Sequence, residues 1–161
     1  MPPKKLVPYT RLNVLSRTTT TEYASPKEFS FRVGAYGILE DKQGRLLMIK
    51  SFNNSLYDLP GGGIKPTESV REACAREFDE ETGLAVEVHE LLTMNESLFA
   101  FNNNPPFHAI RLYYRMTKKG GTLKLHGNDY DSFGCLWVPK KEIDKVNTIE
   151  TVVEALHAIN H

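Results

Sequence analysis

The stretch from Leu59 to Leu84, LPGGGIKPTESVREACAREFDEETGL, constrains the fold more than any other, because it sets three consecutive glycines before a segment with helical spacing. We expect a helix over residues 67–82, with Thr67 as its N-cap and Gly83 where a helix commonly ends on glycine. Glycines permit positive φ and the close approach of a ligand to backbone amides, which can bind phosphate. Three glycines alone are equally typical of a plain turn.

The carboxylates of this helix lie on an unexpected face. At about 100° per residue, Val70 and Cys74 define an apolar arc, and Glu77 and Glu81 fall in the middle of it, with Glu80 at its edge. A Glu-rich helix usually presents its acids to solvent. Here Glu77 and Glu81 cannot both face solvent unless Val70 and Cys74 do so as well, so the spacing predicts carboxylates within a packed surface.

Buried carboxylates that crowd on one helical turn repel each other and need a compensating charge. Arg76 can reach one flank of the group, but one guanidinium does not balance three acids. A divalent cation would, and oxygen-only ligands suit a hard ion such as Mg²⁺ or Mn²⁺.

The whole chain has 161 residues, which is enough for one domain with a sizeable core. Twenty basic residues balance twenty acidic ones, so no global field recruits a nucleic-acid polymer or an anionic membrane. The two cysteines, Cys74 and Cys135, make neither a disulfide framework nor a zinc motif. The N-terminus lacks signal-peptide features and no apolar run is long enough for a membrane helix, so we expect a soluble cytoplasmic protein.

The order of elements favours a mixed sheet with helices packed on it. Residues 29–41 and 45–51 predict a hairpin around a turn, and residues 1–26 predict a strand, a hairpin or a partner-binding arm. Further strands are expected over residues 84–101 and 107–118, a strand that runs into a turn over 135–143, and a second helix over 148–161.

The glycines and the acidic helix together resemble the Nudix box, GX5EX7REUXEEXGU, in which U is a bulky apolar residue. Every fixed position is matched, by Gly62, Glu68, Arg76, Glu77, Phe78, Glu80, Glu81, Gly83 and Leu84. The strand order from about Phe29 onward is also similar to a Nudix domain. We therefore expect a single Nudix domain over residues 27–161, preceded by an N-terminal extension over residues 1–26.

The resemblance implies an α/β/α sandwich around a mixed β-sheet and the hydrolysis of a nucleoside diphosphate linked to another group, X. It implies Mg²⁺ or Mn²⁺ as cofactor and substitution by water at phosphorus. Carried over by position, the metal ligands are Glu77, Glu80 and Glu81, with a backbone carbonyl from Gly62. Arg76 would orient the glutamates, and Glu68 would hold the loop or an additional metal. Gly61, Gly62 and Gly63 would shape the approach of the substrate.

Residues outside the box leave several roles open. The general base is either a box glutamate or a loop acid, for which the candidates are Glu96, Asp129 and Asp131. Tyr57 could stack on a base or pack under the glycine loop, and packing is favoured. Phosphate contacts could come from Arg32, Lys50 or Arg111, although isolated strand cations are more often solvated.

The substrate is bounded only by exclusion. The chain has no signature of coenzyme A or NADH pyrophosphatases, and no proline at the spacing that marks many ADP-ribose hydrolases. MutT-like hydrolysis of a nucleoside triphosphate is therefore the default, with a small-molecule nucleotide rather than a capped RNA as substrate. The alternative is a non-catalytic nucleotide-binding or regulatory module. A homodimer, with residues 1–26 contributing, is possible.

Overall fold

The structure is a computed structural model that describes residues 5–51, 56–125, 134–146 and 148–160. Its larger sheet has the strand order β2-β1-β7-β8-β3-β6, and a smaller sheet has the order β5-β4-β9. The larger sheet comprises β1 (Val7–Asn13), β2 (Thr18–Ala24), β3 (Ser30–Leu39), β6 (Gly61–Gly63), β7 (Leu84–Phe101) and β8 (Phe107–Gly121). The smaller comprises β4 (Arg45–Ser51), β5 (Leu56–Asp58) and β9 (Cys135–Pro139).

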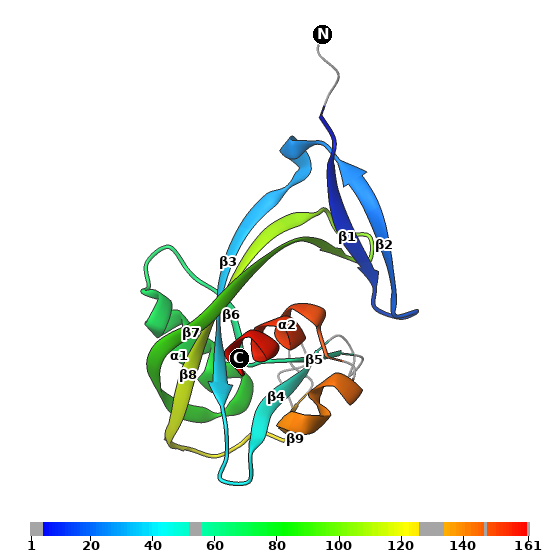
Figure 1. The fold of residues 1–161 in the computed structure, drawn as a ribbon. Helices are drawn as coiled ribbons and strands as arrows, with labels where there is room; N and C mark the ends of the chain where they lie inside the picture. The colour runs from blue at the N-terminus through cyan, green and yellow to red at the C-terminus, as the bar shows by residue number, and fades with distance from the viewer. Residues whose placement is uncertain (1–4, 52–55, 126–133, 147, 161) are drawn as a thin grey trace.

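Two α-helices and two short 3₁₀ helices complete the fold: α1 (Val70–Thr82), α2 (Glu150–Ile159), η1 (Pro26–Glu28) and η2 (Lys140–Lys145). The larger sheet is mixed, because β1 runs parallel to β7 and β3 parallel to β8, whereas β7 and β8 are antiparallel. The predicted mixed sheet with packed helices is confirmed (Figure 1). Among the described residues, neither helix has the length and apolarity needed to span a bilayer.

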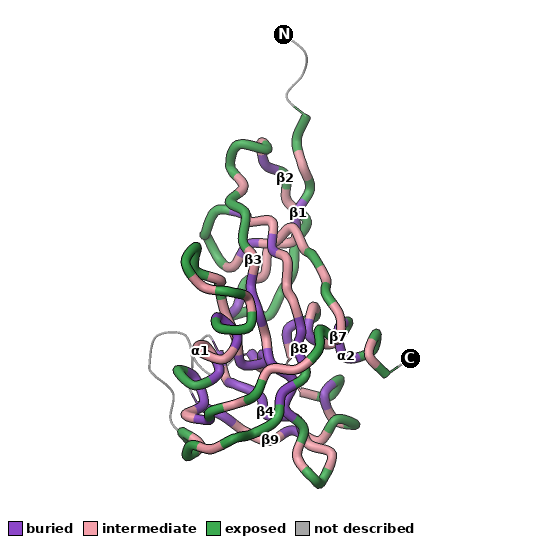
Figure 2. The backbone as a smooth tube through the Cα atoms, turned by 90° about the vertical axis from the view of Figure 1, so that its left-hand side faces the viewer, coloured by how far each residue is buried: buried purple, intermediate pink, exposed green. Residues whose placement is uncertain are grey.

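The core lies on both sides of the sheets, and β4 shows why. Leu47 and Ile49 join the core around α1, whereas Leu46 and Met48 join the core around α2. Successive strand residues point to opposite faces, so a strand that is apolar at every position is buried on both. The buried stretches concentrate where the helices cover the sheets, while β2 is largely exposed and β1 mostly half-buried (Figure 2).

Helix α1 begins later than the sequence suggested. Ser69, rather than Thr67, is the N-cap, because its hydroxyl accepts the Glu72 N–H while the Glu72 carboxylate accepts the Ser69 N–H at 2.7 Å. This reciprocal capping box competes successfully with an earlier start. The helix ends as expected on Gly83, whose φ of 74° is the left-handed conformation of a glycine C-cap.

The predicted hairpin between residues 29–41 and 45–51 is wrong. The turn exists, since the Asp41 N–H donates to the Arg45 carbonyl, but beyond this turn the two described runs pair only through the isolated bridge between Glu40 and Leu46. Each edge of β3 is taken by β8 or β6, and each edge of β4 by β5 or β9. The two strands therefore enter different sheets.

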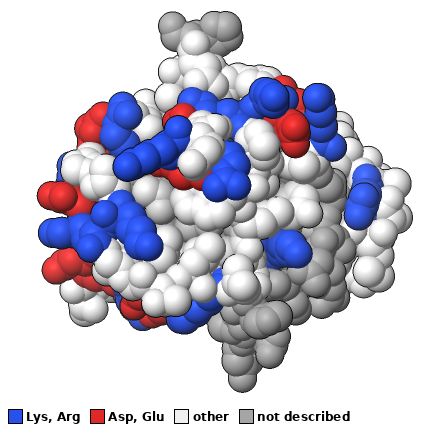
Figure 3. Space-filling view, turned by 90° about the horizontal axis from the view of Figure 1, so that it is seen from below, with Lys and Arg blue, Asp and Glu red and all other residues white. Residues whose placement is uncertain are grey.

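The N-terminal segment forms the hairpin that was one of its predicted alternatives. β1 and β2 pair over their full length, and β1 continues the large sheet by pairing with the end of β7. On the face seen from below, Lys and Arg side chains predominate among the charged groups along the upper and left parts, with acidic side chains between them (Figure 3).

Candidate active site

The orientation of α1 is set by a close contact between the helix and β3. Phe78 is fully buried against Gly37, where a Cβ would lie only 2.6 Å from the Phe78 ring. Close packing of this kind leaves the helix little freedom to rotate. It holds Glu77 and Glu81 toward the glycine strand β6.

Glu81 is one of the few buried charged residues, with 3% of its surface exposed. One of its carboxylate oxygens accepts the Gly61 N–H at 2.8 Å. Gly61 can stand there because it has a φ of 151° and because a Cβ would lie 2.3 Å from the Ala35 carbonyl oxygen. The three glycines therefore form a short strand paired with β3 and not the plain turn that they could equally have formed.

Glu77 lies beside Gly62 on the same surface. A Cβ on Gly62 would lie 2.6 Å from the carboxyl carbon of Glu77, so glycine is what lets the carboxylate reach this position. The side chain of Glu77 is 14% exposed, compared with 53% for Glu80 one turn along. The predicted placement of two carboxylates within the packed face of the helix matches the structure.

Arg76 engages all five of its N–H donors. Its Nε and Nη2 bind the two carboxylate oxygens of Glu68 at 2.9 and 2.6 Å, and its Nη1 binds Glu77 at 2.6 Å and Glu80 at 3.2 Å. Nη2 also donates to the Gly63 carbonyl at 3.2 Å. One guanidinium thus gathers three box glutamates and the end of the glycine strand.

The charges of this cluster shift the pKa values of its members. The hydrogen bonds from Arg76 and from the Lys65 N–H lower the pKa of Glu68 to about 2. The hydrogen bonds and charges of Glu68 and Glu77 raise the pKa of Arg76 above its ordinary value. Glu68 and Arg76 are therefore both charged across the physiological pH range.

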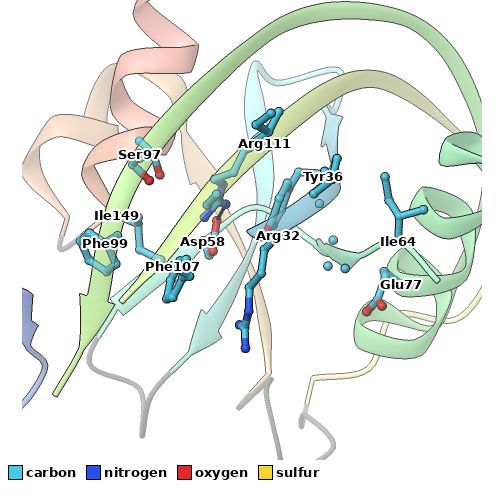
Figure 4. A pocket seen from close by; sticks show the side chains of 18 of the residues that line it. Arg32, Tyr36, Asp58, Ile64, Glu77, Ser97, Phe99, Phe107, Arg111 and Ile149 are labelled. Carbon is cyan, nitrogen blue, oxygen red and sulfur yellow. Dashed lines mark hydrogen bonds and ion pairs between the residues drawn. The ribbon is translucent and has the colours of Figure 1, made fainter. Parts of the chain in front are cut away.

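A cleft of about 540 Å³ begins at this cluster. This volume lies within the range of small-molecule sites. Glu77, Glu81 and the glycine strand line one end, and Phe99, Phe101 and Phe107 line another part, with Arg32 stacked over Phe107 at 5.0 Å (Figure 4). The cleft thus joins an acidic, glycine-lined end to an aromatic one.

Arg111 and Asp58 form an ion pair in the middle of the cleft, with 2.5 Å between Nη2 and Oδ1 (Figure 4). Both side chains are nearly buried, at 11% and 13% exposed. The guanidinium carbon of Arg111 lies 3.8 Å from the centre of the Tyr36 ring, within cation–π distance. Burial opposes the charge of Arg111, but Asp58, Tyr36 and Tyr113 together outweigh it and raise the pKa of Arg111. Burial raises the pKa of Tyr36 to about 12.

Comparison with known proteins decides the family. The family described as NUDIX domain matches residues 30–156, most of the chain. The chain is a member of the Nudix family. The resemblance of residues 62–84 to the Nudix box is thereby confirmed.

Individual Nudix relatives agree with this assignment. An ADP-ribose pyrophosphatase of Methanocaldococcus jannaschii is 38% identical over 95 residues, 57% of this chain and 54% of that protein, so the match spans about half the length of the relative. A MutT-like protein of Streptomyces ambofaciens is 31% identical over 124 residues, 77% and 73% of the two chains. The crystal structure of a MutT protein from Methanosarcina mazei Go1 superimposes with a TM-score of 0.68 at 21% identity, over 83% of this chain and 95% of that one, which confirms the predicted α/β/α fold.

The Nudix family is typically dependent on divalent metals, and the donor set here fits such an ion. The candidate ligands are all oxygens, the donors that Mg²⁺ and Mn²⁺ prefer. Within the described parts of the chain, no three acidic, His or Cys side chains already converge at metal-ligand spacing. Arg76 instead holds Glu77 and Glu80 against itself.

The three cations predicted as phosphate contacts differ in whether they line the cleft. Arg32 and Arg111 line the Nudix cleft, but Lys50 does not. Lys50 stands opposite Tyr57 across β4 and β5, and Tyr57 packs against the core around α2, outside the residues that line the cleft.

The acids proposed as general base fall into two groups, and Glu96 lies within β7 and not on a loop. Glu96 is exposed and bonds to His108 at 2.8 Å, on the opposite face of β7 from Ser97, which lines the cleft. Asp129 and Asp131 lie outside the described residues. Sequence reasoning did not single out Asp58, although a carboxylate directly before the LPGGG segment is a signal that could have been followed.

Proposed function

We propose that this Nudix chain is a divalent-metal-dependent pyrophosphohydrolase that cleaves a P–O–P linkage in a nucleoside diphosphate bonded to a further group, X, with water as the nucleophile. One observation carries the proposal. Two α1 carboxylates, those of Glu77 and Glu80, are held by Arg76, and a third, that of Glu81, by the Gly61 N–H, at the glycine-lined end of a cleft whose other part is aromatic and basic. This combination suits a molecule with a charged pyrophosphate and a flat ring.

The proposed roles are those that the Nudix box implies by position. Glu77, Glu80 and Glu81 would hold Mg²⁺ or Mn²⁺, with the Gly62 carbonyl as a further oxygen ligand. When bound, the cation would neutralise the charge of the pyrophosphate and acidify the attacking water. Arg76 would keep the carboxylates of one helical turn together despite their repulsion, and the Gly61 N–H would keep Glu81 turned to the cleft.

The substrate proposed is a nucleoside triphosphate or a related small nucleotide. The likeness to a MutT-like protein over most of the chain supports it, and the M. jannaschii relative, an ADP-ribose pyrophosphatase, keeps ADP-ribose as the next candidate. The balanced charge of the chain favours a small molecule over a nucleic-acid polymer. We retain residues 27–161 as the catalytic domain, with residues 1–26 as an extension and a homodimer as an untested expectation.

The proposal is tested by incubating the protein with nucleoside triphosphates, dinucleoside polyphosphates, ADP-ribose and other sugar nucleotides. Mg²⁺, Mn²⁺ or excess EDTA is added, and phosphate and pyrophosphate release are measured. We expect release from at least one nucleotide, abolished by EDTA. Glu80→Gln and Glu81→Gln should each lower the rate by about 10³-fold, because each removes a charged ligand. Circular dichroism should show both variants folded.

Two outcomes would contradict the proposal. Full activity in both glutamine variants would exclude these residues as ligands. Tight nucleotide binding by calorimetry, with no product from any compound, would instead identify a non-catalytic nucleotide-binding module.

A further inference from the structure

Two buried polar atoms of the cleft lack a partner. Among the described residues, Arg111 Nε and Thr151 Oγ1 are the buried side-chain nitrogen and oxygen atoms without a hydrogen bond, and both residues line the cleft. Unsatisfied buried polar atoms are uncommon in folded proteins and cost free energy. Both atoms are covered in this structure. A bound molecule can therefore supply the missing partners once the side chains that cover these two atoms shift.

The two residues are held next to the same strand position. Asn95 stands opposite Arg111 across β7 and β8, and its amide donates to the Thr151 carbonyl at 2.6 Å. The hydroxyl of Tyr113 also donates to this carbonyl at 3.2 Å, while its ring centre lies 5.7 Å from the guanidinium carbon of Arg111. The first turn of α2 is thus fastened beside Arg111, which places both unpaired atoms in one part of the cleft.

Arg111 is prepared to donate to a ligand. Asp58 and the face of Tyr36 fix the plane of the guanidinium, and its burial removes most competing water. A guanidinium has donors only, so the group that it meets must be an acceptor. A fixed donor of this kind discriminates strongly between an acceptor and another donor at the same place.

The surroundings specify a flat ring as the bearer of that acceptor. Phe99, Phe101 and Phe107 line the cleft as one cluster, with ring centres 4.6 to 6.1 Å apart. Phe99 and Phe107 lie on the side of the Arg111–Asp58 pair away from Glu77 (Figure 4). Aromatic side chains beside an arginine are a common platform for nucleobases.

We infer that Arg111 and Thr151 are specificity-determining residues that recognise the nucleobase of the substrate by a carbonyl oxygen on its edge. This rests on the proposed function and extends it to the class of base. Guanine and uracil carry a carbonyl oxygen where adenine and cytosine carry an amino group. An amino group there would set N–H against N–H, so keto bases are bound in preference to amino bases.

The test is the binding of analogues of GTP, ATP, UTP and CTP in which methylene groups replace both bridging oxygens of the triphosphate, measured by calorimetry with Mg²⁺. For the unmodified protein we expect the GTP and UTP analogues to bind about tenfold more tightly than those of ATP and CTP. Arg111→Lys, which loses the planar fork, and Thr151→Val should each reduce this ratio to about twofold. Arg115→Lys is the matched control, because Arg115 lies on the same strand, is 56% exposed and pairs with Glu90. It should keep the full ratio.

Equal binding of the four analogues, or tighter binding of the amino bases, would overturn the inference, as would a ratio unchanged in both variants. If Arg111→Lys fails to fold, Thr151→Val decides, since a methyl in place of an unpaired hydroxyl leaves the melting temperature equal or higher. An unchanged ratio in that variant would show that the hydroxyl has no role in base recognition and would contradict the inference. Because the analogues are not hydrolysed, a keto preference in a protein without turnover would contradict only the proposed hydrolysis. Turnover without a base preference would contradict only the base assignment.

Discussion

Two arginines at the cleft differ in how many of their N–H donors have hydrogen-bond partners. At the acidic end, every N–H donor of Arg76 forms a hydrogen bond, to a glutamate or to a backbone carbonyl. Arg111, in the middle, makes one bond to Asp58 and leaves its Nε without a partner among the described residues. Both guanidiniums are mostly buried, so burial alone does not explain the difference.

The difference separates an arginine that organises protein groups from one that is available to a ligand. Three carboxylates on one turn would repel each other without Arg76, and its position is fixed by what it holds. Arg111 is fixed by an ion pair and a ring face, and its unpaired Nε is covered within a side chain that lines the cleft. Substitutions that remove one partner at a time test this reading.

The largest effect is expected from Asp58→Asn, which removes the only ion-pair partner that the structure gives Arg111 within its described residues. A buried guanidinium left without a counter-charge should lower the free energy of unfolding by about 3 kcal/mol. Urea denaturation measures it. The double variant Asp58→Asn with Arg111→Met should recover part of the loss, because it removes the unpaired charge. Equal stability of Asp58→Asn and the unmodified protein would show that the ion pair is not what fixes Arg111.

A smaller effect is expected from Arg76→Lys. Lysine keeps the charge but cannot bridge Glu68, Glu77 and Glu80 in a planar fork. We expect kcat/KM to fall by about 30-fold, or about 2 kcal/mol, by the same factor for every nucleotide hydrolysed. Arg71→Lys, on the exposed side of α1, is the control. A loss that depended on the base would place Arg76 in recognition and erase the contrast with Arg111.

The smallest effect is expected in acid. The pKa of Glu68 is about 2 in the folded protein against an ordinary 4.5, so the carboxylate is stabilised in its charged form. Its contribution to stability is therefore complete above about pH 4.5 and is lost as the pH falls from 4.5 toward 2. Urea midpoints measured across this range should fall less steeply for Glu68→Gln. Parallel pH profiles would mean that the Arg76 cluster does not depend on this glutamate.

Local patterns in the chain predicted the acidic end of the cleft well. The placement of Glu77 and Glu81 within the packed face follows from helical geometry, and the apolar neighbours Cys74 and Phe78 are buried as that geometry requires. Gly83 ends the helix as expected. Each of these features depends on residues within a few turns of one another, which is the range over which one sequence carries direct information.

The middle of the cleft could not be predicted in the same way. Asp58 and Arg111 are in contact only because β5 and β8 come together in the fold. Local patterns in a single sequence do not predict which distant strands lie side by side. Arg111 was recognised as a strand cation that could reach phosphate, without its partner. The predicted hairpin between β3 and β4 is wrong for the same reason, since β3 pairs with the distant strand β8 and β4 with the distant strand β9.

The parallel pairing of β3 with β8 has a kinetic consequence. Ser30 stands beside Phe107, and the register continues to Leu39 beside Met116, so this ladder closes a loop that includes the glycine strand, α1 and β7. Closing so long a loop lowers the entropy of the chain before the contacts between β3 and β8 can offset that loss. Arg32 and Tyr36 enter the cleft from one side of this ladder, and Arg111 from the other. A chain in which β3 and β8 have not yet paired therefore has a complete Nudix box but no cleft. Nucleotide binding would report that these two strands have paired.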